Sequence, residues 1–216
     1  MFASFKTDRV CRGTQVLVAD QPEGPFIPHS NGPVTPRSWE CLDGSFFIDP
    51  AGNPWLIFCH EWLQTYDGEI CALRLSEDLK TPAGWPQVLF SSSQAPWVQL
   101  YTLVSNGGNE IKSGYVTDGP FLYTLKNKTL LMLWSSFGEE GYAIGVSKSK
   151  AGKVVGPWEH NKEPLFKKDG GHAMIFRTFE GNLMLTMHAP NVPPMERPHF
   201  FKMEEIEENI RLMGEK

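Results

Sequence analysis

Three side chains that can give or take a proton stand at the start of apolar segments in separate parts of the chain. Asp43 begins "DGSFFI", Asp118 begins "DGPFLY" and His172 begins "HAMIF". A single aspartate before glycine is usually only a turn residue. Two carboxylates that converge on one cavity can instead do acid/base work, because burial and each other's charge separate their pKa values. Whether Asp43 and Asp118 are turn residues or acids of one site depends on whether the three segments repeat one structure.

An internal repeat favours the acid/base interpretation. Three stretches align without gaps and place the three polar residues at one position: 42–59, 117–134 and 171–188. Each stretch has two apolar runs joined by a short turn with Gly or Asn, which is the pattern of a β-hairpin. Repeating units of this size, too thin to bury both faces, are typical of propeller blades stacked around an axis.

The repeat predicts a single all-β propeller domain that is present in part. "MFASF" at the start resembles "LWSSF" at 133–137, so we expect the chain to open inside a blade whose first strand is absent. The expected units, about three and two-thirds blades, are 1–28, 40–92, 115–166 and 168–216. Open sheet edges are prone to pairing, which predicts association with a second copy or with a partner segment. For 203–213, an amphipathic helix and a last pair of strands both fit the pattern.

Composition excludes several classes of protein. The 216 residues carry a formal net charge of -5, which gives no electrostatic reason to expect a nucleic-acid partner. No apolar run approaches the ~20 residues needed to cross a bilayer, and no signal-peptide pattern opens the chain, so its location is undetermined. The spacing of the four cysteines lacks a zinc pattern. Cys59 and Cys71 lie in apolar strand-like runs, which predicts buried free thiols, with a disulfide framework as the less favoured alternative.

The repeat and its polar residues resemble the glycoside hydrolases of family 43, which are five-bladed β-propellers and include arabinanases, arabinofuranosidases and β-xylosidases. The motifs are "CLDGSFFID", "VTDGPFLY" and "GGHAMIF", and the likeness extends over essentially the whole chain as the last four blades of that fold. The resemblance implies inverting hydrolysis of arabinose- or xylose-containing oligo- or polysaccharides. Family members are often secreted or periplasmic.

The resemblance also implies roles for individual residues. Asp118 takes the position of the general acid and Asp43 that of the carboxylate that tunes its pKa. His172 corresponds to a central-channel residue often found near a bound calcium or a water cluster, so a structural calcium is an expectation although no cofactor is required. Arg197 in "MERPHFF" corresponds to an arginine that contacts the sugar.

Two departures from the family pattern affect the expected activity. The general base belongs to an Asp-Pro motif of the first blade, which no part of this chain supplies, so impaired hydrolysis is expected. Asp118 replaces the usual Glu, and its carboxyl group should lie about 1.5 Å further back, the length of one C–C bond. A non-catalytic carbohydrate-binding propeller is the alternative. A WD-repeat interaction propeller is disfavoured because Gly-His and Trp-Asp signatures are lacking.

Further candidates for substrate contact lie in "FCHEWLQ". Trp62 could stack on a sugar, while His60 and Glu61 could bind hydroxyls. For Trp62 and Glu61 a structural role is an equally good interpretation. His188, at the end of an equivalent strand, could line the rim of the same site.

Overall fold

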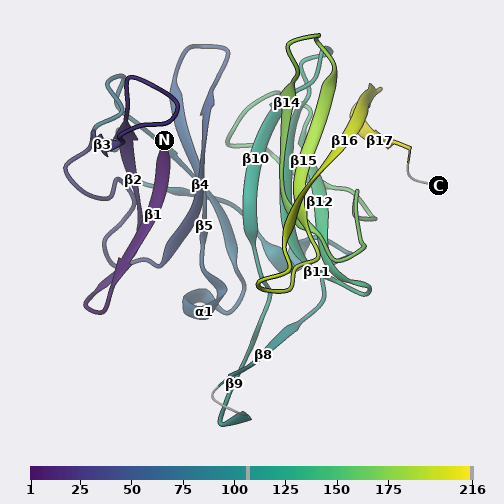
Figure 1. Cartoon of the computed structure of the whole chain (residues 1–216), viewed down its shortest axis with the longest axis horizontal. Coiled ribbons are helices and arrows are strands. Elements are labelled where there is room, and N and C mark those ends of the chain that lie inside the picture. The colour runs from purple at the N-terminus through teal and green to yellow at the C-terminus, as the bar shows by residue number, and fades with distance from the viewer. Residues whose placement is uncertain (106–107, 215–216) are drawn as a thin grey trace.

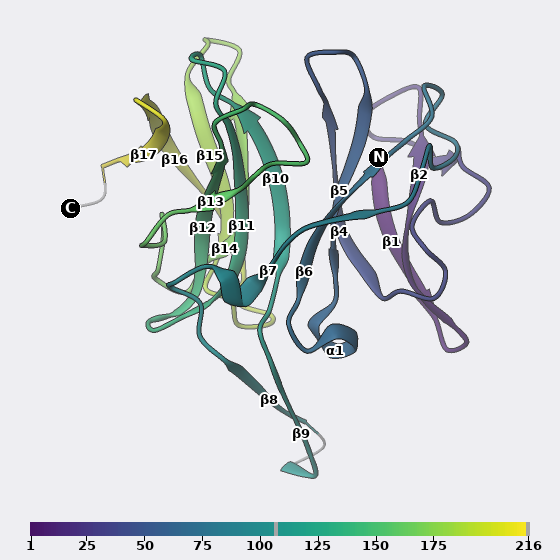
Figure 2. The ribbon, with the colours of Figure 1, turned by 180° about the vertical axis from the view of Figure 1, so that it is seen from behind.

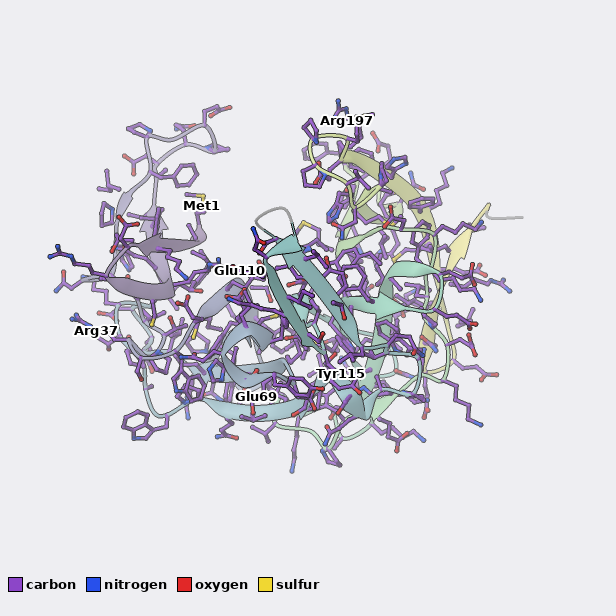
Figure 3. All side chains as sticks on the ribbon, turned by 90° about the horizontal axis from the view of Figure 1, so that it is seen from below. Met1, Arg37, Glu69, Glu110, Tyr115 and Arg197 are labelled. Atoms are coloured by element: carbon purple, nitrogen blue, oxygen red, sulfur yellow. The ribbon has the colours of Figure 1, made fainter. Side chains whose placement is uncertain are left out.

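The computed structural model describes residues 1–105 and 108–214. These residues form four antiparallel sheets that follow one another along the chain, with a two-stranded sheet between the second and the third. Figure 1 shows the sheets side by side, in order from the purple N-terminus to the yellow C-terminus. Seen from below, they are arranged around a centre, and the ring is open between the sheet with Met1 and the sheet with Arg197 (Figure 3). The fold is the predicted all-β, incomplete propeller, and each of the four sheets is a blade.

The strands of each blade are consecutive in the sequence and pair with their neighbours. The N-terminal blade has three strands, β1 (Phe2–Thr7), β2 (Val10–Val18) and β3 (Ile27–Pro28). The second blade has β4 (Cys41–Ile48), β5 (Pro54–His60), β6 (Glu69–Arg74) and β7 (Gln87–Ser91). The third has β10 (Asp118–Thr124), β11 (Leu130–Gly138), β12 (Gly141–Ser149) and β13 (Glu159–His160), and the last has β14 (Gly171–Arg177), β15 (Leu183–Ala189), β16 (Arg197–Ile206) and β17 (Asn209–Met213).

The hydrophobic core lies between the blades. Side chains of a strand point alternately to its two faces, so a strand buried on both sides reads as a continuous apolar run. In β5, Leu56 and Phe58 pack towards the N-terminal blade, whereas Ile57 and Cys59 pack towards the third blade. The side chains of β11 alternate in the same way, with one face packed towards the second blade and the other towards the last blade. Each blade thus depends on its neighbours for burial.

The connecting elements gather at one end of the propeller. The short helix α1 (Trp62–Thr65) follows β5, and the hairpin of β8 (Tyr101–Ser105) and β9 (Glu110–Gly114) projects below the body of the molecule (Figures 1 and 2). A 3-10 turn, η1 (Ser92–Gln94), leads from β7 towards this hairpin. β9 is followed closely by β10, so the first strand of the third blade begins at the same end.

Two open expectations are decided by the fold. Residues 203–213 form the end of β16 and all of β17, so the alternative with strands is correct and the helix is wrong. The four cysteines are free, so the prediction for Cys59 and Cys71 is confirmed and the disulfide alternative is wrong. In the part of the chain that the structure describes, no helix is both long and apolar enough to span a membrane.

Candidate active site

The first strands of three blades bring the three polar residues together. β10 contacts both β4 and β14 around the centre of the propeller. Each contains a β-bulge close to its beginning, where the pairing with the next strand shifts. Because a bulge bends a strand and re-aims its side chains, it can turn a residue of an inner strand towards a shared site. Asp43, Asp118 and His172 all lie at or beside these bulges.

The predicted alignment is wrong by one residue along the third-blade stretch, because 118–135, and not 117–134, pairs in the same way as 42–59 and 171–188. The strand pairing makes Asp118 equivalent to Leu42 and Gly171, each of which is the last paired residue before its bulge. Asp43 and His172 are the next residue along, and both have positive φ angles, 56° and 52°. Gly119 fills that position in the third blade, with φ of 51°. Asp43 and His172 are therefore equivalent, and Asp118 reaches the site from the preceding position.

Hydrogen bonds join the three residues into one network. Nε2 of His172 lies 2.8 Å from Oδ2 of Asp43, and the N–H of Gly119 donates to the same oxygen at 3.0 Å. The hydroxyl of Tyr142, in β12, donates to Oδ2 of Asp118 at 2.9 Å and lies 3.1 Å from Nδ1 of His172. The His172 backbone is held by its N–H bond to Oγ of Ser135. Tyr142 thus connects the acid of one blade to the histidine of the next.

The two carboxyl groups have opposite electrostatic environments. Burial and then the negative charge of Asp43 raise the pKa of Asp118 from 3.8 to about 6, against the opposing effects of His172 and Tyr142. Burial by itself would raise the pKa of Asp43, but its hydrogen bond to His172 and the charge of His172 lower it. A pair of carboxyls with separated pKa values is the arrangement that lets one give a proton while the other stays ionised.

The imidazole of His172 is tuned by the same contacts. Burial by itself would lower its pKa, but the hydrogen bond and the charge of Asp43, followed by the charge of Asp118, raise it above 6.5. Burial raises the pKa of Tyr142 well above 10, with the charge of Asp118 as the next cause, so the phenol keeps its proton. The site therefore holds an ionised Asp43, a cationic His172 in mildly acidic solution and a protonatable Asp118.

The likeness to known proteins decides the family. The model of the glycosyl hydrolases of family 43 matches residues 1–204. This chain belongs to glycosyl hydrolase family 43. The predicted membership and the predicted propeller fold are both confirmed.

Solved structures support the assignment of this family-43 chain. An endo-arabinase from Bacteroides thetaiotaomicron VPI-5482 is 50% identical with a TM-score of 0.87, and the match covers 95% of this chain and 70% of that one. A thermostable family-43 glycoside hydrolase is 19% identical, with a TM-score of 0.78 and coverage of 100% and 70%. An endo-1,4-beta-xylanase from the same Bacteroides strain shares the fold at 20% identity, with a TM-score of 0.69 and coverage of 99% and 75%. No curated protein matches.

The other predicted substrate contacts of the family-43 chain are mostly engaged in packing. His60 is buried, with Nδ1 2.9 Å from Oε2 of Glu69 and Nε2 2.8 Å from Oε1 of Gln64. Trp62 is only 9% exposed. Its ring lies where a side chain at Gly114 of β9 would stand and meets Tyr101 edge to face. The Trp62 contacts hold α1 against the β8–β9 hairpin, the His60 ring stacks on Trp39 with centroids 4.1 Å apart, and both rings are buried.

Glu61 and Arg197 have different surroundings. Arg197 lies at the start of β16, where its guanidinium donates to the carbonyl oxygens of Pro194 and Glu196 and makes no contact with the carboxyls. Glu61 is buried beside Arg12 of the N-terminal blade, 3.3 Å from its Nη1. Burial is the main cause that raises the pKa of Glu61. Through charge Glu61 affects Asp118 and Arg12 affects Asp43, so both border the carboxyl pair.

Sequence reasoning missed Tyr142 and Arg12. Tyr142 lies outside the aligned hairpins, in the third strand of its blade, and nothing in "GYAIGV" distinguishes its hydroxyl. The Tyr142 ring fills the space left at Gly171, since a Cβ there would stand 2.0 Å from Cε1, and this packing is visible only in the structure. His188, by contrast, does reach the site: its ring is 5.6 Å from that of His172 and 5.9 Å from that of Tyr142, between centroids.

The surroundings of His172 do not match a calcium site built from side chains. Both of its ring nitrogens face protein partners, Asp43 and Tyr142. Across residues 1–105 and 108–214, no three His, Cys, Asp or Glu side chains are grouped so as to hold a metal. Calcium takes six to eight oxygen ligands. The side chains around His172 do not supply such a set of oxygen ligands.

Replacement of Asp43 by Asn should change both of its neighbours. In Asp43→Asn, the pKa of His172 should fall because burial remains while the anionic partner is lost, and the pKa of Asp118 should fall because a nearby negative charge is removed. NMR titration of labelled His and Asp measures both. Asp49→Asn is the control, since that carboxylate bonds only within its own hairpin turn at Asn53, Ala51 and Trp55. Titration curves unchanged in Asp43→Asn would contradict the assigned network.

Proposed function

We propose that this family-43 chain acts on arabinose-containing glycans and that its carboxyl pair supports inverting hydrolysis, with Asp118 as the general acid and Asp43 as the carboxylate that keeps Asp118 protonated. The observation that carries the proposal is the raised pKa of Asp118, about 6, beside an Asp43 whose pKa is lowered. Arabinose is preferred over xylose because the named endo-arabinase is 50% identical, whereas the named xylanase is 20% identical.

The chemistry follows from the protonation states. Asp118 gives its proton to the glycosidic oxygen as the bond to the sugar breaks, and the leaving group departs as an alcohol. Asp43 stays ionised because His172 donates to it, and its charge keeps the proton on Asp118 before the reaction. Tyr142 orients the carboxyl by donating to Oδ2. Asp118 therefore supplies acid catalysis without needing a change in Asp43.

Inversion needs a third group that removes a proton from water on the opposite face of the sugar, with the acid and base carboxyls roughly 6.5–9.5 Å apart. The family resemblance assigns that role to an Asp-Pro motif of the first blade, whereas Asp49–Pro50 of this chain lies in the hairpin turn after β4. We therefore propose that the 216-residue polypeptide cleaves slowly, since a general base contributes about 10²–10⁴-fold. The presence of two of the three acids also favours the second candidate, a propeller that binds carbohydrate without cleaving it.

Azide separates these proposals. Azide attacks the anomeric carbon without deprotonation, so it bypasses the base while still needing Asp118 for a poor leaving group. Residues 1–216 should release little sugar from linear arabino-oligosaccharides, and azide should raise the rate by about tenfold or more. The product should be a glycosyl azide of inverted configuration, identified by NMR.

Each other outcome points to a definite alternative. Fast turnover without azide would refute the proposed impairment. Binding of arabino-oligosaccharide in calorimetry without any cleavage, with or without azide, would refute hydrolysis and support the binding protein. Xylo-oligosaccharide, assayed in parallel, tests the preference for arabinose.

A further inference from the structure

A continuous chain of hydrogen-bond contacts runs from Asp43 through His172 and Tyr142 to Asp118. Its three links are 2.8 Å, 3.1 Å and 2.9 Å long. When His172 is an imidazolium, Nε2–H donates to Asp43 and Nδ1–H donates to the Tyr142 oxygen, while the Tyr142 hydroxyl donates to Asp118. Every link then holds one proton, and the two donors between His172 and Asp118, Nδ1–H and the Tyr142 hydroxyl, both point towards Asp118.

The members of this chain differ in their access to water. Tyr142 is 1% exposed, so its hydroxyl has no direct route to solvent. The side chain of His172 is 39% exposed. Asp118 is half-buried, and a substrate bound over it would further restrict the water that reaches its carboxyl group. His172 is thus the member that can exchange protons with solvent while substrate or product is present.

We propose that Tyr142 and His172 form a proton path that returns a proton to Asp118 after each cleavage. The inference rests on the proposed function, because only a general acid has to be recharged in every cycle. It assigns Tyr142 as the residue that both positions Asp118 and carries its proton, since its hydroxyl donates to Asp118 and lies 3.1 Å from Nδ1 of His172.

The transfer balances in protons and charge. After cleavage Asp118 is a carboxylate and His172 an imidazolium. The Tyr142 hydroxyl gives its proton to Oδ2 of Asp118 while Nδ1 of His172 gives its proton to the Tyr142 oxygen, so no tyrosinate is formed. The products are a neutral Asp118 and a neutral His172 that still donates Nε2–H to Asp43. A hydronium ion or a buffer acid then recharges the exposed imidazole.

The packing around Tyr142 holds the phenol in place for this role. Its ring packs against Phe137, with centroids 5.2 Å apart, and stacks with His188. Gly171 leaves the space that the ring occupies, since a Cβ there would stand 2.0 Å from Cε1. A fixed phenol with two polar partners is better suited to directed transfer than a freely rotating one, because both donor and acceptor are already aligned.

All charged neighbours of His172 are compatible with transfer near neutral pH. Asp43 of β4 and Asp118 of β10 both raise its pKa, and His188 of β15 is the other titratable ring beside it. Beyond these, Arg12 and Glu61 act on the two carboxyls by charge. The pKa of Asp118 is about 6 and that of His172 is raised above 6.5, so the imidazolium and the carboxylate coexist between these values.

Tyr142→Phe tests the path, because it removes the hydroxyl and keeps the ring. In the free protein, the pKa of Asp118 should rise, since a hydrogen bond to its ionised form is lost, and the ¹⁵N shift of His172 Nδ1 should move towards that of a solvent-exposed nitrogen. In azide-assisted cleavage, kcat should fall about 10- to 100-fold with KM unchanged. Added imidazolium buffer should restore the rate of the variant and leave the wild type unaffected.

Tyr101→Phe is the matched control. Its ring stacks on Phe137 at the same end of the propeller, and it should leave all four readouts unchanged. If Tyr142→Phe alters neither titration nor shift while the wild type cleaves arabino-oligosaccharide, the path is wrong and the proposed function stands. If kcat falls without rescue by buffer, Tyr142 only positions Asp118 and the proton path is refuted. If the NMR changes occur but the wild type cleaves nothing under any condition, the proposed function fails, and the path fails with it.

Discussion

Asp118→Asn should make the protein more stable at pH 7.5 and less active on arabino-oligosaccharides. The folded state holds the Asp118 proton up to about pH 6, whereas the unfolded chain loses it near pH 3.8. Between these values the folded state binds more protons, so the free energy of unfolding falls as the pH rises, by up to about 3 kcal/mol. Asn carries no charge and keeps an oxygen that can accept from Tyr142, so the variant avoids this loss.

The stability effect should depend on pH in a defined way. At pH 7.5 the unfolding temperature of Asp118→Asn should exceed that of the wild type, at roughly 2–4 °C for each kcal/mol in a chain of this size. Near pH 4 the difference should vanish, because Asp118 is then protonated in the folded wild type and half-protonated in the unfolded chain. Thermal unfolding followed by circular dichroism at several pH values measures it. A variant less stable than the wild type at pH 7.5 would contradict the assigned environment of Asp118.

The effect on activity should depend on the leaving group. Azide-assisted cleavage of arabino-oligosaccharide should fall about 10²–10⁴-fold in Asp118→Asn, because the departing sugar alkoxide needs a proton. Cleavage of a nitrophenyl arabinofuranoside should fall much less, since nitrophenolate leaves without one. Asp20→Asn, at an exposed position, is the control and should change neither rate. Equal losses on both substrates would show that Asp118 does not act as the acid.

Gly171→Ala is expected to destabilise the fold and to break the hydrogen bonds that Tyr142 makes with Asp118 and His172. The new methyl group would stand 2.0 Å from Cε1 and 2.7 Å from Cδ1 of Tyr142, and 2.9 Å from Oγ of Ser135. Tyr142 is packed on all sides and cannot rotate away, so either the ring or the backbone of β14 must shift. Overpacking of a filled core typically costs about 1–3 kcal/mol, and occasionally more. Gly171→Ala should therefore unfold at a clearly lower temperature.

The same variant should disturb the hydrogen bonds that depend on Tyr142. If its hydroxyl moves, Asp118 loses its donor and its pKa should rise, which NMR titration would detect in the folded protein at low temperature. Gly84→Ala is the matched control, because nothing lies within 4 Å of a Cβ built there. An unfolding temperature for Gly171→Ala equal to that of Gly84→Ala would show that the contact with Tyr142 is readily relieved.

Local patterns in the sequence were sufficient for the blades. Apolar runs joined by short turns specify hairpins, because strands buried on both faces read as continuous apolar segments. β4 with β5, β10 with β11 and β14 with β15 each pair as antiparallel neighbours. The acidic and histidine residues at the beginnings of these strands were also visible as candidates, because hairpins that repeat around an axis bring equivalent ends together.

What the sequence by itself determined was therefore the kind of fold, the inner strands and the membership of Asp43, Asp118 and His172 in one site. Only the tertiary structure decided which positions of the blades are equivalent, which residue links Asp118 to His172, and how the pKa of Asp118 is shifted. The strand pairing shows that 118–135, and not 117–134, corresponds to 42–59 and 171–188, so Gly119 rather than Asp118 is equivalent to Asp43 and His172. Tyr142 acquires its role only because blades three and four pack together around Gly171. Burial and charge at such contacts set the pKa of Asp118, since both depend on neighbours distant in the chain.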